Sequence, residues 1–261
     1  MKRIESIDNR RIKFANSLKQ SKYRKQNQMF LSEGLRNVEL ACTNPEIIEH
    51  IFIEESKANQ PRYKCILENN DIDAYLVSDK IIRSISDTVT SQGIVAICKM
   101  VDYSEYKFYL DEDVLILDRV QDPGNLGTIL RTAEAAGIKT IICTIGTADI
   151  YSPKVVRSAM GSIVTLRIIF IDKIEYIERL KEEGYQIIVS SLDDAYDYSK
   201  IISIKTKIAL VLGNEANGVS QDILDLSDYN VKIPIYGKAE SLNVAIAGGI
   251  LLYKLNERKL S

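Results

Sequence analysis

The chain has 261 residues, of which 27% are charged and 46% hydrophobic, and its formal net charge is −2. This length suits one large or two ordinary domains, and the balanced composition excludes a disordered or collagen-like chain. No apolar run approaches the roughly 18 residues of a membrane-spanning helix, and the first residues lack a signal peptide's apolar stretch, so we expect a cytoplasmic protein with no membrane partner.

The first hundred residues have the apolar periodicity and the turn residues of a compact α/β unit. The predicted helices span 10–25, 34–42, 61–69 and 79–85, and the predicted strands span 48–53, 74–77 and 94–98. A polar, acidic stretch follows these elements. We therefore predict a first domain over 1–102 and a linker over 103–112.

Positive charge is concentrated at the start of this domain, where residues 1–36 contain ten basic and three acidic side chains. A clustered positive segment on a nearly neutral chain is typical of a protein that binds a nucleic-acid backbone. A solvated helix face explains the cluster equally well, because basic runs are common on ordinary surfaces. The candidate nucleic-acid-binding residues are Arg10, Arg11, Lys13, Lys22, Arg24 and Lys25.

Residues 113–261 change to short, β-branched strands that alternate with helices, which predicts a parallel sheet covered on both faces. The predicted strands span 114–117, 140–143, 164–169, 186–189 and 208–212. A last helix is predicted over 241–256. Its two apolar stripes imply burial on more than one side, and hence a homodimer. One stripe holds Leu242, Ile246, Ile250 and Tyr253, and the other holds Val244, Ala247, Leu251 and Leu255.

Cysteine and histidine are too sparse to indicate a metal or redox site. Cys42, Cys65, Cys98 and Cys143 form no CxxC pair, so we expect reduced, mostly buried thiols and no bound metal. His50 is the only histidine available for Ser-His or Cys-His catalysis, and its apolar neighbours favour a strand position.

Three segments rich in Gly and Asn follow strands in the second half of the chain, over 125–131, 212–218 and 233–244. Ligands of open α/β sheets bind at the carboxyl ends of the strands, so the three segments predict one composite site. The segment from Gly213 to Gly218 is not a Walker A loop, because Val219 occupies the position that requires Lys. No GxGxxG follows a strand either.

Together these segments resemble the three ordered motifs of the SpoU/TrmH family of RNA ribose 2′-O-methyltransferases, within the SPOUT superfamily. The resemblance covers 113–261, and residues 1–102 resemble more loosely the family's N-terminal substrate-binding domain, which is akin to ribosomal protein L30e. The motifs are Asn125-x-Gly127-x-x-x-Arg131-x-Ala133, then Gly213-x-Glu215-x-x-Gly218, then Ile233-Pro234 followed by Ser241-Leu242-Asn243-Val244.

The resemblance implies an α/β fold with a SPOUT methyltransferase domain, a parallel sheet and a trefoil knot, plus a smaller N-terminal α/β domain. It also implies S-adenosyl-L-methionine as cofactor and RNA as partner, with ribosomal RNA favoured over transfer RNA. The alternative is a non-catalytic RNA-binding or ribosome-associated protein that retains the fold. The implied cofactor-binding residues are Leu212, Gly213, Gly218, Ile233, Ser241, Leu242 and Asn243.

The implied catalytic residues are Arg131, Asn125, Glu215, Ser241 and Asn243. An arginine in an apolar stretch is often a buried ion-pair partner, but the family associates Arg131 with activation of the ribose hydroxyl. A guanidinium holds its proton in proteins and is a poor base, so we expect Arg131 to stabilise the developing alkoxide or to bind the adjoining phosphate. Asn125, or a neighbour, can cap the helix that carries Arg131, and Asn125 would orient the ribose or Arg131. Glu215 would anchor its loop.

Overall fold

The computed structural model describes residues 2–68, 72–103, 112–192 and 195–258. Contacts between residues divide the chain into two compact units, one formed by Met1–Val101 with Asp149–Thr165 and the other by Asp102–Ala148 with Leu166–Ser261. Only the two end residues of the predicted linker, 103–112, lie within the described part. The two units are therefore treated separately.

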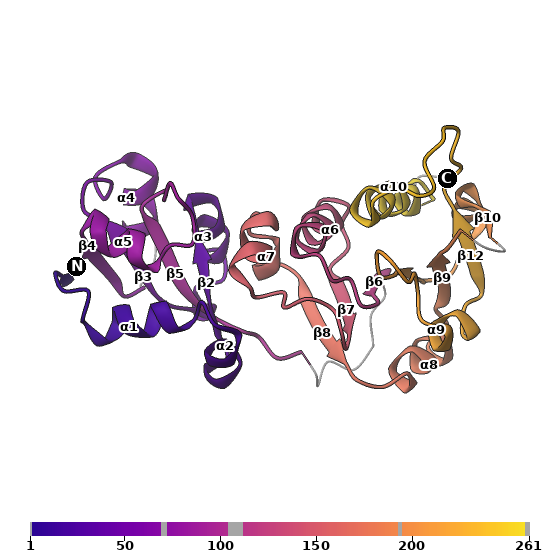
Figure 1. Ribbon diagram of the computed structural model, residues 1–261, viewed down its shortest axis with the longest axis horizontal. Helices are drawn as coiled ribbons and strands as arrows, with labels where there is room; N and C mark the ends of the chain where they lie inside the picture. Colours follow the sequence, from indigo (N-terminus) through magenta and orange to yellow (C-terminus); the bar gives the residue numbers. More distant parts are fainter. Residues whose placement is uncertain (1, 69–71, 104–111, 193–194, 259–261) are drawn as a thin grey trace. The chain divides into compact units, whose positions relative to one another are not determined.

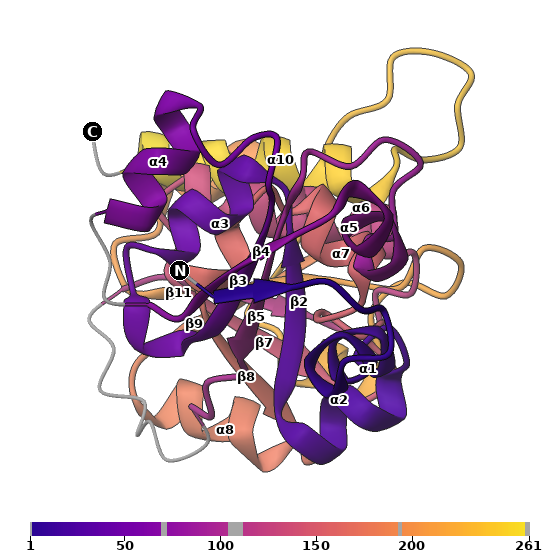
Figure 2. The same ribbon diagram turned by 90° about the vertical axis from the view of Figure 1, so that its left-hand side faces the viewer.

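The first unit contains a five-stranded mixed sheet whose strand order is β1-β4-β3-β5-β2. Figure 2 labels its strands β2, β3, β4 and β5. The strands are β1 (Lys2–Ile4), β2 (Met29–Glu33), β3 (Ile48–Glu54), β4 (Ala74–Val77) and β5 (Ile94–Lys99). β1, β3 and β4 are parallel, whereas β5 runs antiparallel to β2 and β3. The three predicted strands are confirmed. Strands β1 and β2 were not predicted, because such short segments become strands through pairing with β4 and β5, which the local sequence does not show.

Five helices of this unit precede the linker: α1 (Arg10–Ser17), α2 (Ser21–Asn27), α3 (Leu35–Ala41), α4 (Pro61–Glu68) and α5 (Asp79–Ile85). A single 3-10 turn, η1, spans Pro45–Ile47. The single helix predicted over 10–25 is wrong, because Gln20 adopts an extended conformation (φ −94°, ψ 133°) and separates α1 from α2. Ile12 of α1, Leu18 directly after this helix and Ile82 of α5 belong to one buried cluster against the sheet.

The segment 149–165 belongs to the first unit, although it is distant from it in sequence. It forms α7 (Pro153–Ser158) and a 3-10 turn, η2 (Ser162–Val164), and α7 packs on β2. The Tyr151 ring lies 4.9 Å from the Phe30 ring. The predicted strand 164–169 instead begins at residue 167, because η2 occupies the preceding residues.

The second unit is built on a wholly parallel seven-stranded sheet, with strand order β10-β12-β9-β11-β6-β7-β8. The strands are β6 (Val114–Leu117), β7 (Thr140–Thr144), β8 (Arg167–Ile171), β9 (Gln186–Ser190), β10 (Tyr196–Asp197), β11 (Ile208–Leu212) and β12 (Tyr229–Lys232). The helices are α6 (Pro123–Ala135), α8 (Glu175–Glu182), α9 (Gln221–Asp225), α10 (Val244–Glu257) and the 3-10 helix η3 (Tyr198–Ser203).

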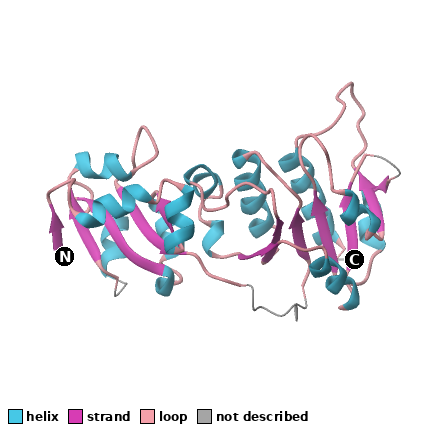
Figure 3. Ribbon diagram, turned by 60° about the horizontal axis from the view of Figure 1, so that its bottom comes forward, coloured by secondary structure: helices cyan, strands magenta, loops and turns pink. Residues whose placement is uncertain are grey.

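Helices cover both faces of this sheet, as the sequence predicted. α6 and α10 lie together on one face, and α8 and α9 lie on the other (Figures 1 and 3). Strands β6, β7, β9 and β11 confirm the predicted parallel strands. The sheet therefore brings the carboxyl ends of neighbouring strands to one edge, where the three motif segments follow.

The last helix begins at residue 244, later than predicted, because the Asn243 side chain accepts from the N–H groups of Ala245 and Ile246 and caps it. Among the residues that the structure describes, one of its two apolar stripes is covered and the other is not. Leu251 and Leu255 are fully buried, and the helix packs on α6. The other stripe is open to solvent, at Leu242, Ile246, Ile250 and Tyr253.

Two further expectations concern membranes and metals. No helix of the described residues is long and apolar enough to cross a membrane, and they contain no group of three His, Cys, Asp or Glu that could hold a metal. Cys98 and Cys143 are buried free thiols, whereas Cys65 is exposed. His50 lies in β3, edge-on to the Phe52 ring, and burial lowers the pKa of its imidazole.

Candidate active site

The second and third motif segments line a cavity of about 630 Å³ in the second unit, whereas no residue of the first motif lines it. This volume lies within the roughly 300–1,000 Å³ of typical small-molecule and cofactor sites. The cavity opens where β9, β11 and β12 end. All seven residues predicted to bind a cofactor line it, namely Leu212, Gly213, Gly218, Ile233, Ser241, Leu242 and Asn243.

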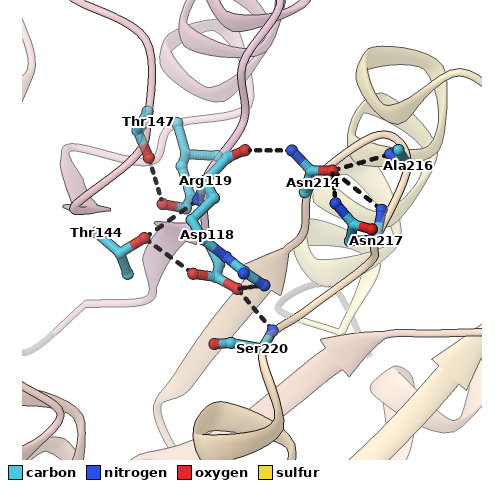
Figure 4. A network of polar contacts seen from close by, with 9 residues as sticks. Asp118, Arg119, Thr144, Thr147, Asn214, Ala216, Asn217 and Ser220 are labelled. Atoms are coloured by element: carbon cyan, nitrogen blue, oxygen red, sulfur yellow. Dashed lines mark hydrogen bonds and ion pairs between the residues drawn. The ribbon is translucent and has the colours of Figure 1, made fainter.

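The loop after β11 is closed on itself by hydrogen bonds, which fixes one wall of the cavity. The backbones of Asn214 and Gly218 exchange two hydrogen bonds, of 2.9 and 3.0 Å. The Asn214 side-chain oxygen accepts from the backbone N–H of Ala216 and of Asn217, each at 3.0 Å (Figure 4). A Cβ at Gly213 would overlap the backbone of Gly218, so glycine is required there.

A second set of hydrogen bonds ties the three motifs together through their side chains. The Glu215 carboxylate accepts from the backbone N–H of Gln121 and Asp122 and from the Asn125 side-chain NH₂, each at 3.1 Å. The Asn125 side-chain oxygen accepts in turn from the Asn243 side chain at 2.9 Å. Glu215 thus anchors its loop to the first motif, and Asn125 links that motif to the third.

The Glu215 carboxyl is held in its ionised form. Burial alone would raise its pKa, but the hydrogen bonds that it accepts from Asn125 and from backbone N–H groups outweigh that effect and lower the pKa below its ordinary 4.5. A carboxylate with a lowered pKa is a weak base at neutral pH. Glu215 is therefore suited to holding the loop, and poorly suited to removing a proton.

The helix carrying Arg131 is capped by Asp122, whose carboxylate accepts from the Asn125 backbone N–H at 2.8 Å. Pro123 occupies the first turn, where its missing N–H costs nothing. Asp122, and not Asn125, is thus the capping residue. The Asn125 side chain instead makes the contacts between motifs.

Arg131 is exposed on α6, so it is not a buried ion-pair partner. It has no ion pair with any residue in the described ranges, and it does not line the cavity. Six residues of helix place it about 9 Å along the axis from Asn125. Its guanidinium is free to meet a substrate, and its role in the reaction stays a prediction.

The cavity includes residues that the sequence reasoning missed. Ser190 ends β9 and Ser191 follows it, while Lys232 ends β12 and Ile235 lies in the loop that follows. The carboxyl-end rule would have found the two serines if it had been applied to the predicted strand 186–189. No comparable signal marked β12, which was not predicted.

The basic residues proposed for RNA binding differ in their surroundings. Arg10, Lys22 and Lys25 are exposed. Lys13 is exposed and pairs with Asp8, and Arg11 stacks over the Tyr75 ring, 5.0 Å from its centroid.

Arg24 differs from these residues because it is buried. It donates to the backbone carbonyls of Leu18 and Lys19 and pairs with Asp149 at 2.5 Å. Arg24 therefore fixes the segment 149–165 to the first unit, and its guanidinium does not belong to the exposed basic surface.

Comparison with known proteins agrees with this geometry. Residues 112–253 match the SpoU rRNA Methylase family, and residues 9–96 match the MRM3-like substrate binding domain. The chain is 38% identical to the 23S rRNA (guanosine(2553)-2′-O)-methyltransferase RlmP of Bacillus subtilis (strain 168), over 98% of this chain and 99% of that protein.

Solved structures give the same answer. The fold is similar to that of an rRNA methyltransferase from Sinorhizobium meliloti, with a TM-score of 0.87, 30% identity and coverage of 100% and 99% of the two chains. The AdoMet-bound form of an rRNA methyltransferase from the same organism gives a TM-score of 0.86, also at 30% identity, over 100% of this chain and 99% of that chain. The chain therefore belongs to the SpoU rRNA methylase family, and the family predicted from the three motifs is confirmed.

Proposed function

We propose that this chain transfers the methyl group of S-adenosyl-L-methionine to a ribose 2′-hydroxyl of ribosomal RNA. The observation that carries the proposal is a cavity lined by the second and third motifs and hydrogen-bonded to the first through Asn125, in a chain of the SpoU rRNA methylase family. The name of the Bacillus subtilis relative supports ribosomal RNA over transfer RNA, and such a substrate implies a cytoplasmic enzyme.

The residues present fit the cofactor. The volume suits a nucleoside-sized ligand, and the backbones of Gly213 and Gly218 lie so close together that Gly213 could carry no side chain. Ser241 and Asn243 would form the floor of the pocket, with the backbone around Leu212, Gly213, Ile233 and Leu242 beside the adenosine. When bound, the cofactor supplies an electrophilic sulfonium methyl group.

The protein's own contribution is then to orient the ribose and to stabilise the oxygen that loses its proton. Arg131 suits the second task, because its guanidinium stays charged and is free of protein partners among the described residues. The hydrogen bonds between Glu215 and Asn125 and between Asn125 and Asn243 hold together the loops where the methyl group would be transferred. The proton leaves to water or to phosphate, and the reaction needs no metal.

The chain acts as a homodimer in this proposal. The exposed stripe of α10 supports it, because Ile246 and Tyr253 are both more than half exposed although they are large and apolar. A second copy that packs on this stripe would bury it, as the periodicity of the helix requires.

We propose the trefoil knot from family membership, because knots are so rare in proteins that general rules of topology would not predict one. Two close approaches support it. The last helix packs on α6, the first helix of its unit, and a Cβ at Gly248 would collide with the Leu212 side chain.

We also propose the division of the chain into domains. Residues 1–102 form an L30e-like substrate-binding domain, residues 103–112 a linker and residues 113–261 the methyltransferase domain.

Binding of RNA by the basic surface can be measured through its salt dependence. Replacing Arg10 and Lys22 together with Gln should lower the slope of log K against log salt by about 0.7–0.9 per lost phosphate contact. The matched control replaces Arg62 and Lys64 of α4, which removes the same charge elsewhere. Equal slopes for both variants would mean that α1 and α2 present only a solvated face.

A further inference from the structure

Arg119, which follows β6, has a backbone conformation that its position in the fold does not explain. Its φ is +55°, and the only other described non-glycine residues with positive φ are Gln28 and Met160. Those two lie at the ends of α2 and α7, where left-handed residues are common. Arg119 lies in the loop just after a strand, where a left-handed arginine is unfavourable and typical of functional sites.

The surrounding structure holds Arg119 in this conformation from both sides (Figure 4). Its backbone N–H donates to the Thr144 hydroxyl at 3.1 Å, and its carbonyl accepts from the Asn214 side chain at 2.9 Å. Gly146, with φ +97°, makes room for the side chain, because a Cβ there would lie 3.1 Å from Arg119 Cγ. Two unusual backbone conformations thus serve the placement of one guanidinium.

A purely structural role does not account for this arginine. The buried Asp118 carboxylate accepts from the Ser220 backbone N–H at 2.7 Å and from the Thr144 hydroxyl at 2.9 Å, whereas Arg119 Nη2 lies farther away, at 3.3 Å. Asp118 therefore keeps two good donors without Arg119. Glycine would fit the backbone better, yet the chain carries a charged side chain there that is 37% exposed.

The position of the guanidinium indicates which anion it meets. Asn214, which holds the Arg119 carbonyl, lines the cofactor cavity, but Arg119 itself does not. The guanidinium therefore lies beside the site without entering the cofactor space. The Nη end of this guanidinium contacts the Asp118 carboxylate, the side chain is partly exposed, and guanidinium N–H donors match a phosphate oxyanion.

We propose that Arg119 binds a phosphodiester of the RNA substrate next to the ribose that is methylated, with Asp118 orienting its guanidinium. This inference rests on the proposed RNA methyltransferase function. It adds a substrate contact on the β6 side of the site, separate from Arg131 and from the basic helices α1 and α2.

The test compares Arg119→Gly with the wild type in the full chain. Glycine removes the side chain and relieves the backbone, so the melting temperature should stay equal or rise. Affinity for S-adenosylmethionine, measured by calorimetry, should change less than twofold. Binding of a 23S ribosomal RNA transcript should lose about 0.7–0.9 in salt slope, as for one lost phosphate contact, and kcat/KM for methyl transfer should fall at least tenfold.

Two controls make the result specific. Gln28→Gly gives the same backbone relief at a left-handed residue outside the site, and it should alter neither binding nor turnover. Arg119→Lys keeps the charge, so it should restore the salt slope while recovering only part of kcat/KM.

Three outcomes would overturn the proposal: an unchanged salt slope in Arg119→Gly, a melting temperature that falls in that variant, or weaker cofactor binding that accounts for the whole loss. The last outcome would assign Arg119 to the cofactor carboxylate. Because RNA binding is measured apart from turnover, a wild-type chain that methylates no ribosomal RNA would contradict the proposed function alone.

Discussion

Replacing Asn243 with Ala should weaken both the fold and the cofactor site, because this side chain has two roles. Its oxygen caps α10 by accepting from Ala245 and Ile246, and its NH₂ donates to Asn125. Loss of an N-cap costs about 1 kcal/mol, and loss of an exposed hydrogen bond costs about 0.5 kcal/mol more. At roughly 2–4 °C per kcal/mol for a protein of this size, the melting temperature should fall by about 3–6 °C.

The Asn243→Ala variant should also bind the cofactor more weakly. The bond from Asn243 to Asn125 joins the third motif to the first, so its loss should raise the Kd for S-adenosylmethionine by about 2–10-fold. Asn243→Asp is the matched control, since it keeps the cap and loses only the donor. It should melt close to the wild type and still bind the cofactor more weakly. Unchanged melting and affinity in Asn243→Ala would refute the reasoning.

Three other variants test separate parts of the site. Arg131→Ala should leave cofactor affinity within a few-fold and lower methyl transfer by roughly 10²–10³, so full turnover on the true RNA would exclude the role given to Arg131. Ile246→Glu should convert the dimer into a monomer in light scattering, whereas a wild-type monomer at micromolar concentration would contradict the proposed interface. The lowered pKa of Glu215 means that its carboxylate stabilises the fold above pH 4.5 and loses that effect as pH falls through the folded-state pKa. The stability gap between wild type and Glu215→Gln should therefore narrow on acidification below pH 4.5, and a constant gap would contradict the anchoring role.

The sequence predicted the second sheet well because its buried parallel strands have a local signature. Val114–Leu117 and Ile208–Leu212 are uninterrupted apolar runs, and every residue in them is fully buried. The candidate site was predictable for a related reason, since Gly213 directly follows a strand and Asn243 directly precedes a helix. The elements missed in this sheet, such as β12, carry polar residues and form strands only by pairing with neighbours such as β9.

Other features depend on contacts between distant parts of the chain. The sequence suggests that Arg24 is one more surface cation, but the structure shows it in a buried ion pair with Asp149, 125 residues away. The packing of Gly161 against Leu40 likewise joins the segment after the first motif to the first unit. Neither periodicity nor charge counts contain this information, because both describe only neighbours in sequence.

The central claim is tested most directly by incubating the full chain with S-adenosylmethionine labelled in its methyl group and with 23S ribosomal RNA transcripts, followed by alkaline hydrolysis. A ribose 2′-O-methyl group blocks cleavage of the adjoining phosphodiester, so the label should appear in an alkali-resistant dinucleotide from one position. The label should disappear with Arg131→Ala. Label released in mononucleotides, or none transferred to ribosomal RNA by folded protein that binds the cofactor, would contradict the account.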